Sequence, residues 1–169
     1  MSGHRQSDQF VTLGLDQEVF AVPVEVVREI LDMRQPFRIP DAPAHLAGLI
    51  DVRGQAVPVI DLRLKLGLPA RAASADTRIL VLEVPMAGRS LSLGLIADRV
   101  FEVTALDAGS LSPPPDIGSM WRSDYIEGIG RRGDSFVVIF DVSRLLSSED
   151  VALLRADAPR VAQPAMSEA

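Results

Sequence analysis

Apolar and polar positions alternate in short runs along this chain, and the runs come in pairs. The pairs are residues 9–15 with 18–22, 47–52 with 55–60, 78–84 with 89–97, and 125–131 with 135–140. Each pair flanks a short turn and predicts a β-hairpin. Short, regularly spaced strands with few helical stretches are typical of small barrels or a sandwich, so the fold is expected to be mainly β.

Helical patterns are short. In residues 24–31 the apolar positions share one face of a helix, which predicts one or two amphipathic turns, with a strand as the alternative. Asp61 and Asp141 stand where N-caps would begin two short helices. The sequence Ser-Ser-Glu-Asp at 147–150 resembles a capping box and predicts a C-terminal helix over about 148–157.

The chain aligns with itself. Residues 46–66 align without a gap on 126–146, and residues 20–30 align on 93–103. Equivalent pairs include Gly48 and Gly128, Val57 and Val137, Asp61 and Asp141, Val27 and Val100, and Glu29 and Glu102. The alternative is that glycine, two strands and an aspartate recur by chance, because such patterns are common in β proteins.

The duplication predicts two similar subdomains, of about residues 9–70 and about 76–146. Neither has much room for a core of its own, so we expect the two to pack on each other. The seam between them is a natural place to bind a partner. The polar residues 1–8 and the Pro- and Ala-containing residues 158–169 are expected to be flexible tails.

Composition excludes several classes of function. The 169 residues include 17 Lys+Arg and 23 Asp+Glu, and this net charge of −6 argues against a nucleic-acid partner or an anionic membrane surface. No cysteine is present and only two histidines are, so neither a thiolate nor a His-rich metal site is expected. The longest uncharged run, 42–50, is too short to cross a membrane, and the first residues do not resemble a signal peptide. We therefore expect a soluble, intracellular protein without a metal or cofactor.

No catalytic motif stands out. The phosphate-binding loop, the nucleophile elbow and the zinc-protease helix are all absent. His45 lies in an apolar stretch, which favours a packed or turn-exposed histidine over a catalytic one. The acid pairs Glu25 with Glu29 and Asp98 with Glu102 have helical spacing, but solvated charges explain them better than acid–base catalysis does. The sequence predicts no enzyme.

The order of motifs resembles the CheW family of chemotaxis coupling proteins over about residues 9–156. The segments that carry the resemblance are FAVPVEVVREI, RIPDAPAHLAGLIDVRGQAVPVIDLRLKLGL, DTRILVLEV, GLIADRVFEV, LSPPPD and YIEGIGRRGDSFVVIFDVSRLLSSEDVALL. The most specific part is 47–66, which contains the family's R-G turn followed by V-P-V-I-D-L-R. Asp51 departs from the asparagine that the family commonly has, but an aspartate can cap the same turn.

The resemblance implies a single CheW-like domain over 9–156 with two SH3-like five-stranded β-barrel subdomains, short helices and the C-terminal helix. It also implies a non-enzymatic adaptor without cofactors. Such an adaptor couples methyl-accepting chemotaxis receptors, at their cytoplasmic tip, to the regulatory domain of the histidine kinase CheA. The protein would then be cytoplasmic and recruited to membrane-associated receptor arrays, with no membrane insertion of its own.

The resemblance also implies two sets of site residues. A receptor-binding groove would involve Val27, Glu29, Gly48, Arg53, Gly94 and Val100, and a kinase-binding surface would involve Met33, Phe37 and Ile39. The two glycines could equally serve barrel bends, and the kinase set could equally belong to the core. Glu29 and Arg53 carry opposite charge and are predicted to pair, with a cost of about 1–3 kcal/mol for loss of either partner. That structural role is at least as plausible as direct receptor contact.

Three other functions remain open on sequence alone. One is a CheW-like scaffold of a chemosensory pathway unrelated to motility. Another is a small-molecule-binding or enzymatic β-barrel, which would require a deep pocket with converging polar groups. A general peptide-binding SH3-like module would need an aromatic groove, and a single tryptophan (Trp121) and a single tyrosine (Tyr125) make that a poor fit.

Overall fold

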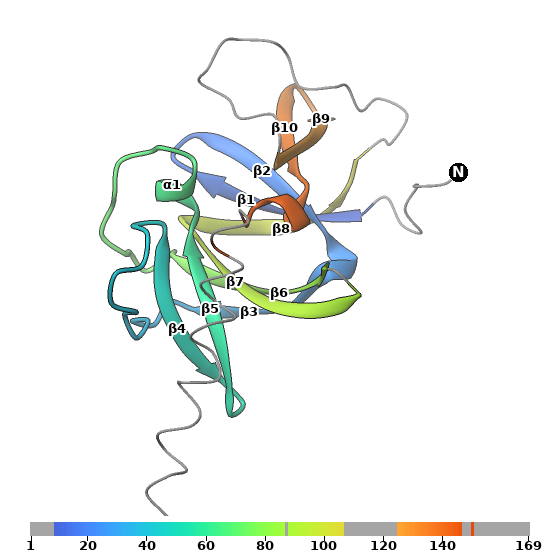
Figure 1. Ribbon diagram of the computed structural model, residues 1–169. Helices are drawn as coiled ribbons and strands as arrows, with labels where there is room; N and C mark the ends of the chain where they lie inside the picture. Colours follow the sequence, from blue (N-terminus) through green and yellow to red (C-terminus); the bar gives the residue numbers. More distant parts are fainter. Residues whose placement is uncertain (1–8, 87, 107–124, 147–149, 151–169) are drawn as a thin grey trace, which may run out of the picture.

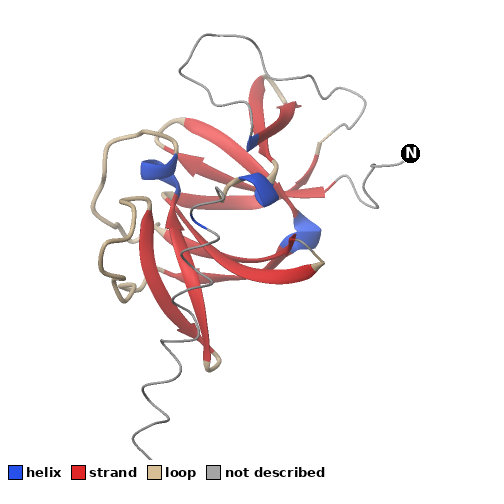
Figure 2. Ribbon diagram, viewed as in Figure 1, coloured by secondary structure: helices blue, strands red, loops and turns tan. Residues whose placement is uncertain are grey.

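Strands dominate the computed structural model, which describes residues 9–86, 88–106, 125–146 and 150 (Figure 2). The strands are β1 (Gln9–Leu15), β2 (Glu18–Pro23), β3 (Val27–Asp32), β4 (Leu46–Val52), β5 (Gln55–Asp61), β6 (Arg78–Met86), β7 (Arg89–Ala97), β8 (Arg99–Ala105), β9 (Ile126–Arg132) and β10 (Ser135–Phe140). The helices within these ranges are one turn long: η1 (Val24–Val26), α1 (Leu62–Lys65) and η5 (Val142–Arg144). The mainly β class predicted from the pattern is confirmed.

The strands form two five-stranded mixed sheets. Sheet A has the order β8-β1-β2-β10-β9 and occupies the upper part of Figure 1, and sheet B has the order β3-β6-β7-β5-β4 and lies below it. Each sheet contains one parallel pair, β2 with β10 in sheet A and β7 with β5 in sheet B. The strands that the duplication makes equivalent occupy the same position in the two orders: β8 corresponds to β3, β2 to β7, β10 to β5 and β9 to β4.

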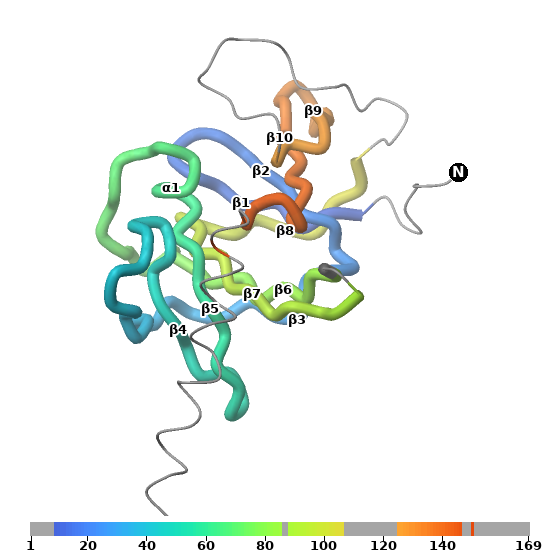
Figure 3. Tube along the Cα trace, viewed as in Figure 1, coloured from blue at the N-terminus to red at the C-terminus, as the bar shows by residue number. Residues whose placement is uncertain are grey.

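The expected boundaries of the two subdomains, about 9–70 and about 76–146, are corrected by this topology. Sheet B consists of the continuous stretch 27–97, and sheet A combines the hairpin β1–β2 with β8, β9 and β10 from the other end of the chain. After β2 the chain crosses through η1 into sheet B, and after β7 it crosses back at Asp98, a path that can be followed in Figure 3. The hairpins were visible in sequence because they are local, whereas the pairing of β2 with β10 is long-range.

The duplication itself is visible in the backbone. Asp61 N–H donates to the carbonyl of His45 at 2.8 Å, and the equivalent Asp141 N–H donates to the carbonyl of Tyr125 at 3.1 Å. Asp61 also caps α1, because its side chain accepts from the N–H groups of Arg63 and Leu64. Asp141 precedes η5 without a side-chain cap bond, so only the first of the two predicted caps forms.

All four predicted hairpins are present, with ends within one or two residues of the expected positions. The predicted amphipathic helix over 24–31 is wrong beyond its first turn, since η1 gives way to strand β3 at Val27. In the β4–β5 turn, Arg53 and Gly54 both have positive φ, at 53° and 83°. The Asp51 carboxylate accepts from Gly54 N–H at 2.7 Å, so aspartate does cap this turn as expected.

The apolar core has three parts. Ile50, Val57, Val59, Ile79 and Val81 fill the inner face of sheet B, and Phe10, Ala21, Leu106, Val137 and Ile139 fill that of sheet A. The largest cluster lies between the sheets and includes Leu13, Phe20, Leu80, Leu95 and Phe140, with the rings of Phe20 and Phe140 stacked at 5.1 Å. The two sheets therefore pack on each other, as their small size requires.

Some expectations concern residues outside the described ranges. The tails 1–8 and 158–169 lie outside them, and so does the C-terminal helix over about 148–157 except for Asp150. Among the described residues, no helix has both the length and the apolar character needed to cross a bilayer.

Candidate functional site

Glu29 and Arg53 form an ion pair between the two edges of sheet B. Glu29 lies on the edge strand β3, and Arg53 lies in the turn that follows the opposite edge strand β4. The two guanidinium nitrogens donate to the two carboxylate oxygens at 2.5 and 3.2 Å, so the pair is bidentate. The predicted pairing is confirmed, and it joins the two edges of the sheet.

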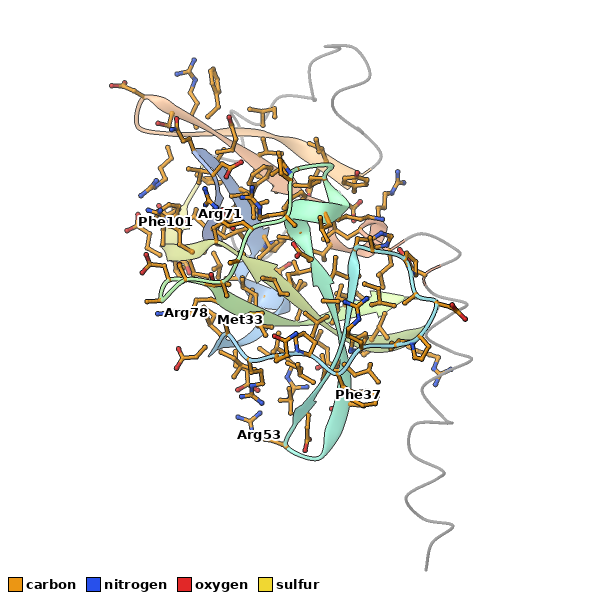
Figure 4. The ribbon with its side chains drawn as sticks, turned by 90° about the vertical axis from the view of Figure 1, so that its left-hand side faces the viewer. Met33, Phe37, Arg53, Arg71, Arg78 and Phe101 are labelled. Atoms are coloured by element: carbon orange, nitrogen blue, oxygen red, sulfur yellow. The ribbon has the colours of Figure 1, made fainter. Side chains whose placement is uncertain are left out.

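The solvent exposure of this pair lowers the contribution to folding stability that is expected from it. The Arg53 side chain is 73% exposed and that of Glu29 is 23% exposed. An ion pair with one solvated partner stabilises a fold by less than about 1 kcal/mol, below the range expected for a partly buried pair. Arg53 is thus free to present charge to a partner, and Figure 4 places it at the far end of the β4–β5 hairpin.

Gly48 allows the segment after β3 to pair with β4, which brings the two edges of sheet B together. Phe37 and Leu49 exchange two backbone hydrogen bonds, Phe37 N–H to Leu49 O at 2.7 Å and Leu49 N–H to Phe37 O at 2.8 Å. A Cβ on Gly48 would lie 2.2 Å from the Phe37 carbonyl oxygen, and Gly48 has φ of +143°. Arg34 adds a bond to the carbonyl of Asp51 at 3.0 Å. Gly48 is therefore buried and structural, and no side chain fits there.

The three residues expected to contact the kinase lie in different environments. Phe37 is 71% exposed although its backbone is paired, so its ring projects from the surface (Figure 4). Met33 is half-buried against the inner face of sheet B, and Ile39 packs on the cluster between the sheets. Of this set, Phe37 presents the largest apolar surface to solvent, and the other two contribute mainly to packing.

The remaining residues of the expected receptor groove, Val27, Val100 and Gly94, lie on three different strands. Val27 begins β3 in sheet B and Val100 lies on β8 in sheet A, and both pack at the margin of the cluster between the sheets. Gly94 is buried on β7, where a Cβ would lie 3.1 Å from Ile79 and 3.3 Å from Val59. Gly94 is therefore placed in the interior and not on a surface.

Sheet A carries a second pair of the same kind that sequence reasoning missed. Arg132 at the end of β9 donates to Glu102 on β8 at 3.0 Å, so this pair also joins the two edge strands. The alignment of Glu29 with Glu102 was a signal that could have predicted it. In both sheets a β-bulge lies beside the glutamate, on the edge strand β3 or β8.

Sheet A, which carries this second pair, also exposes three large apolar side chains. Phe101, Val103 and Phe136 are all substantially exposed on β8 and β10. Arginine side chains lie over the two rings, with Arg99 and Arg132 at 5.9 and 5.8 Å from the centre of Phe101 and Arg131 at 4.9 Å from that of Phe136. The position of these side chains could not be predicted from the sequence, because strand β8 was not predicted.

A buried arginine joins the two sheets on the side of α1. The Arg63 side chain is 8% exposed and donates to Asp16 Oδ1 at 2.7 Å, Asp98 Oδ2 at 2.8 Å and the Pro69 carbonyl at 2.8 Å. The more exposed Arg71 lies 3.4 Å from Asp16 and 3.2 Å from Asp98. The hydrogen bond from Arg63 is the main cause that lowers the pKa of Asp16, and the same bond raises the pKa of Arg63. Asp16 and Arg63 therefore stay charged near neutral pH.

His45 has a specific partner that was not predicted. Its Nε2 lies 3.0 Å from both oxygens of the Asp150 carboxylate, which is almost fully buried. Lys65 Nζ lies 3.6 Å from the same carboxylate. These contacts fix Asp150 against the segment before β4 and against α1. Among the described residues, no group of three or more histidine and acidic side chains could hold a metal ion.

Comparisons with known proteins agree with this architecture. A family model described as a CheW-like domain matches residues 9–150. The chain is 29% identical over 154 residues to the chemotaxis protein CheW of Klebsiella aerogenes, covering 91% of this chain and 90% of that protein. It is 27% identical to CheW of Treponema pallidum, with 91% of each covered.

A solved structure shows the same fold. The scaffolding protein TtCheW from Thermoanaerobacter tengcongensis matches with a TM-score of 0.76 at 30% identity, covering 86% of this chain and 96% of that one. The family model spans both sheets and Asp150, including the R-G turn and the V-P-V-I-D-L-R segment. The chain therefore belongs to the CheW family of chemotaxis coupling proteins.

Proposed function

We propose that this chain is a non-enzymatic adaptor that couples methyl-accepting chemotaxis receptors to the histidine kinase CheA. It acts in the cytoplasm at membrane-associated receptor arrays and uses no cofactor. The observation that carries the proposal is that the family's R-G turn presents the exposed Arg53 beside Glu29 on sheet B. The exposed Phe37 lies on the segment that pairs with β4 of the same sheet. An adaptor requires separate surfaces, since it raises the local concentration of one partner near the other.

The assignment of partners to surfaces is part of this proposal. Val27, Glu29, Arg53 and Val100 would contribute to the receptor surface. Phe37 would contribute the main apolar contact to the kinase. Gly48 and Gly94 act indirectly by shaping the sheet, because both are buried. Met33 and Ile39 act in the same way, by supporting the segment that carries Phe37.

We also propose that each sheet closes as an SH3-like barrel and that both belong to one domain over 9–156. The backbone bonds between Phe37 and Leu49 support closure of sheet B, and the Glu102–Arg132 pair supports closure of sheet A. The shared apolar cluster between the sheets supports a single folding unit. The N-terminal and C-terminal halves of the chain would then not fold separately, because each sheet contains strands from both halves.

The test is reconstitution of the purified chain with CheA and a soluble receptor signalling fragment. We expect the chain to retain both proteins in a pull-down and to increase receptor-dependent kinase autophosphorylation. Arg53→Glu should weaken receptor binding by about tenfold, since it places two carboxylates side by side. Combining it with Glu29→Arg should restore part of the loss by reversing the pair.

Sheet A provides the matched control. Arg132→Glu makes the same charge change at the equivalent pair with Glu102, and we expect receptor affinity to stay within about twofold of the unchanged chain. Equal loss in both variants would mean that net charge and not the Arg53 surface governs binding. Retention of a small molecule with neither protein retained would support the small-molecule-binding barrel instead.

A further inference from the structure

The chain crosses between the two sheets twice, and the two crossings are held by different kinds of contact. The first crossing, β2 to β3, runs through η1, and the second, β7 to β8, runs through Asp98. They lie on opposite sides of the molecule, with η1 on the right in Figure 2 and α1, which carries Arg63 to the second crossing, on the left in Figure 1.

Charged groups fix the second crossing. Besides its bonds to Arg63 and Arg71, the Asp98 carboxylate accepts from Asp16 N–H at 2.8 Å, and Asp98 N–H donates to the Gly14 carbonyl at 3.0 Å. Asp16 and Gly14 belong to the β1–β2 hairpin of sheet A, whereas Arg63 belongs to α1, which follows β5 of sheet B. Arg63 therefore links one sheet directly to the other.

The first crossing has no such link in the part of the chain described. Glu25, which the duplication makes equivalent to Asp98, is exposed and forms no ion pair there. Among the described residues, the side chain of Ser143, the equivalent of Arg63, bonds only to the nearby Asp141 at 2.7 Å. Instead Val24, Val26 and Val27 pack on the cluster between the sheets. Apolar contacts lack directional preference, so this side permits small changes of angle that a buried hydrogen-bonded guanidinium does not.

We propose that Arg63 is a positioning residue that fixes the angle between sheets A and B. With Arg63 in place, the crossing at Asp98 is rigid, and the apolar contacts at the η1 crossing adjust to the angle that it sets. Without Arg63, Asp16 and Asp98 repel each other, and the sheets can turn about the remaining apolar contacts. The consequence for signalling rests on the proposed function: a partner on sheet A and a partner on sheet B would be held at one defined angle.

A distance measurement between the sheets tests this directly. The chain has no native cysteine, so Gln55→Cys and Ser135→Cys accept one spin label each. These exposed positions begin β5 and β10, at the distal ends of the two hairpins, where a rotation has the largest effect. We expect a single narrow distance distribution by pulsed electron spin resonance, and in Arg63→Met a broadened distribution with a shifted maximum.

Controls separate positioning from general loss of stability. Ser143→Ala, at the equivalent place in the other half, should leave the distribution unchanged. Arg63→Lys keeps one charge but not the planar group that reaches both carboxylates and Pro69, so it should give an intermediate shift. Asp16→Asn removes the negative charge of one of the two carboxylates that Arg63 binds, at an exposed residue, and serves as the milder variant if Arg63→Met does not fold. Folding is checked by near-ultraviolet circular dichroism.

An unchanged distribution in folded Arg63→Met, or in Asp16→Asn where Arg63→Met fails to fold, would overturn the proposal. The label-to-label distance needs no partner, so its outcome is independent of the proposed function. If the distribution broadens while the chain binds neither CheA nor receptor, the positioning role stands and the adaptor function fails. If both partners bind and the distribution is unchanged, the reverse holds.

Discussion

Sheets A and B are built from equivalent strands in the same order, but different side chains stabilise their ends and crossings. Sheet B closes with a bidentate pair and a backbone bridge made possible by Gly48. Sheet A carries a single contact between Glu102 and Arg132 beside exposed rings. The duplication thus preserves the backbone, while specialisation occurs in side chains at equivalent places.

The backbone bridge gives the largest expected difference. Gly48→Ala should lower the free energy of unfolding by about 2–4 kcal/mol, because the new Cβ collides with a backbone carbonyl and the φ of this residue is unfavourable for alanine. Gly94→Ala should cost about 1 kcal/mol, since only side-chain methyl groups must move. Urea unfolding measures both, and equal costs would refute the role given to the bridge.

The next largest difference in stability is expected between variants at the two crossings between the sheets. Arg63→Met should lower the free energy of unfolding by about 2 kcal/mol, because it leaves the Asp98 carboxylate shielded from water without its main partner. Ser143→Ala should cost about 0.5 kcal/mol. Thermal unfolding of the two variants at the same pH makes the comparison, and a smaller cost for Arg63→Met than for Ser143→Ala would contradict it.

Acid should weaken the interaction between Arg63 and Asp16. The folded-state pKa of Asp16 lies below its ordinary value of 3.8, so its stabilising contribution is present above that value and is lost as pH falls through the folded pKa. The stability difference between the unchanged chain and Asp16→Asn should be constant above about pH 5 and shrink below about pH 4. Urea titrations across this range measure it, and a difference that grows on acidification would show the opposite sign.

Variants of the two exposed ion pairs should differ least in the free energy of unfolding. Arg53→Ala and Arg132→Ala should each change the free energy of unfolding by less than about 1 kcal/mol, since each pair has one largely solvated partner, Arg53 in the first and Glu102 in the second. Their effects should separate in binding, where the Arg53 variant loses receptor affinity and the Arg132 variant does not. A large loss of stability in Arg53→Ala would assign that residue a structural role instead.

Local patterns predicted local structure well. The four hairpins and the capping role of Asp61 were accessible, because each depends on neighbouring residues. The Glu29–Arg53 pair was accessible through the family resemblance and the opposite charges of its members. Strand β8 and the exchange of strands between sheets were not, since the pairing of β1 with β8 joins residues about 90 positions apart. Arg63 was missed for the same reason, because its partners Asp16 and Asp98 meet it only in the folded chain.

The central claim is that one molecule holds kinase and receptor at the same time on separate surfaces. The most direct test adds a receptor signalling fragment to this chain already saturated with CheA and follows the mass of the complex by analytical ultracentrifugation. The account predicts a ternary complex in which CheA stays bound at every receptor concentration. Displacement of CheA as receptor is added would mean that both compete for one surface, and it would contradict the account.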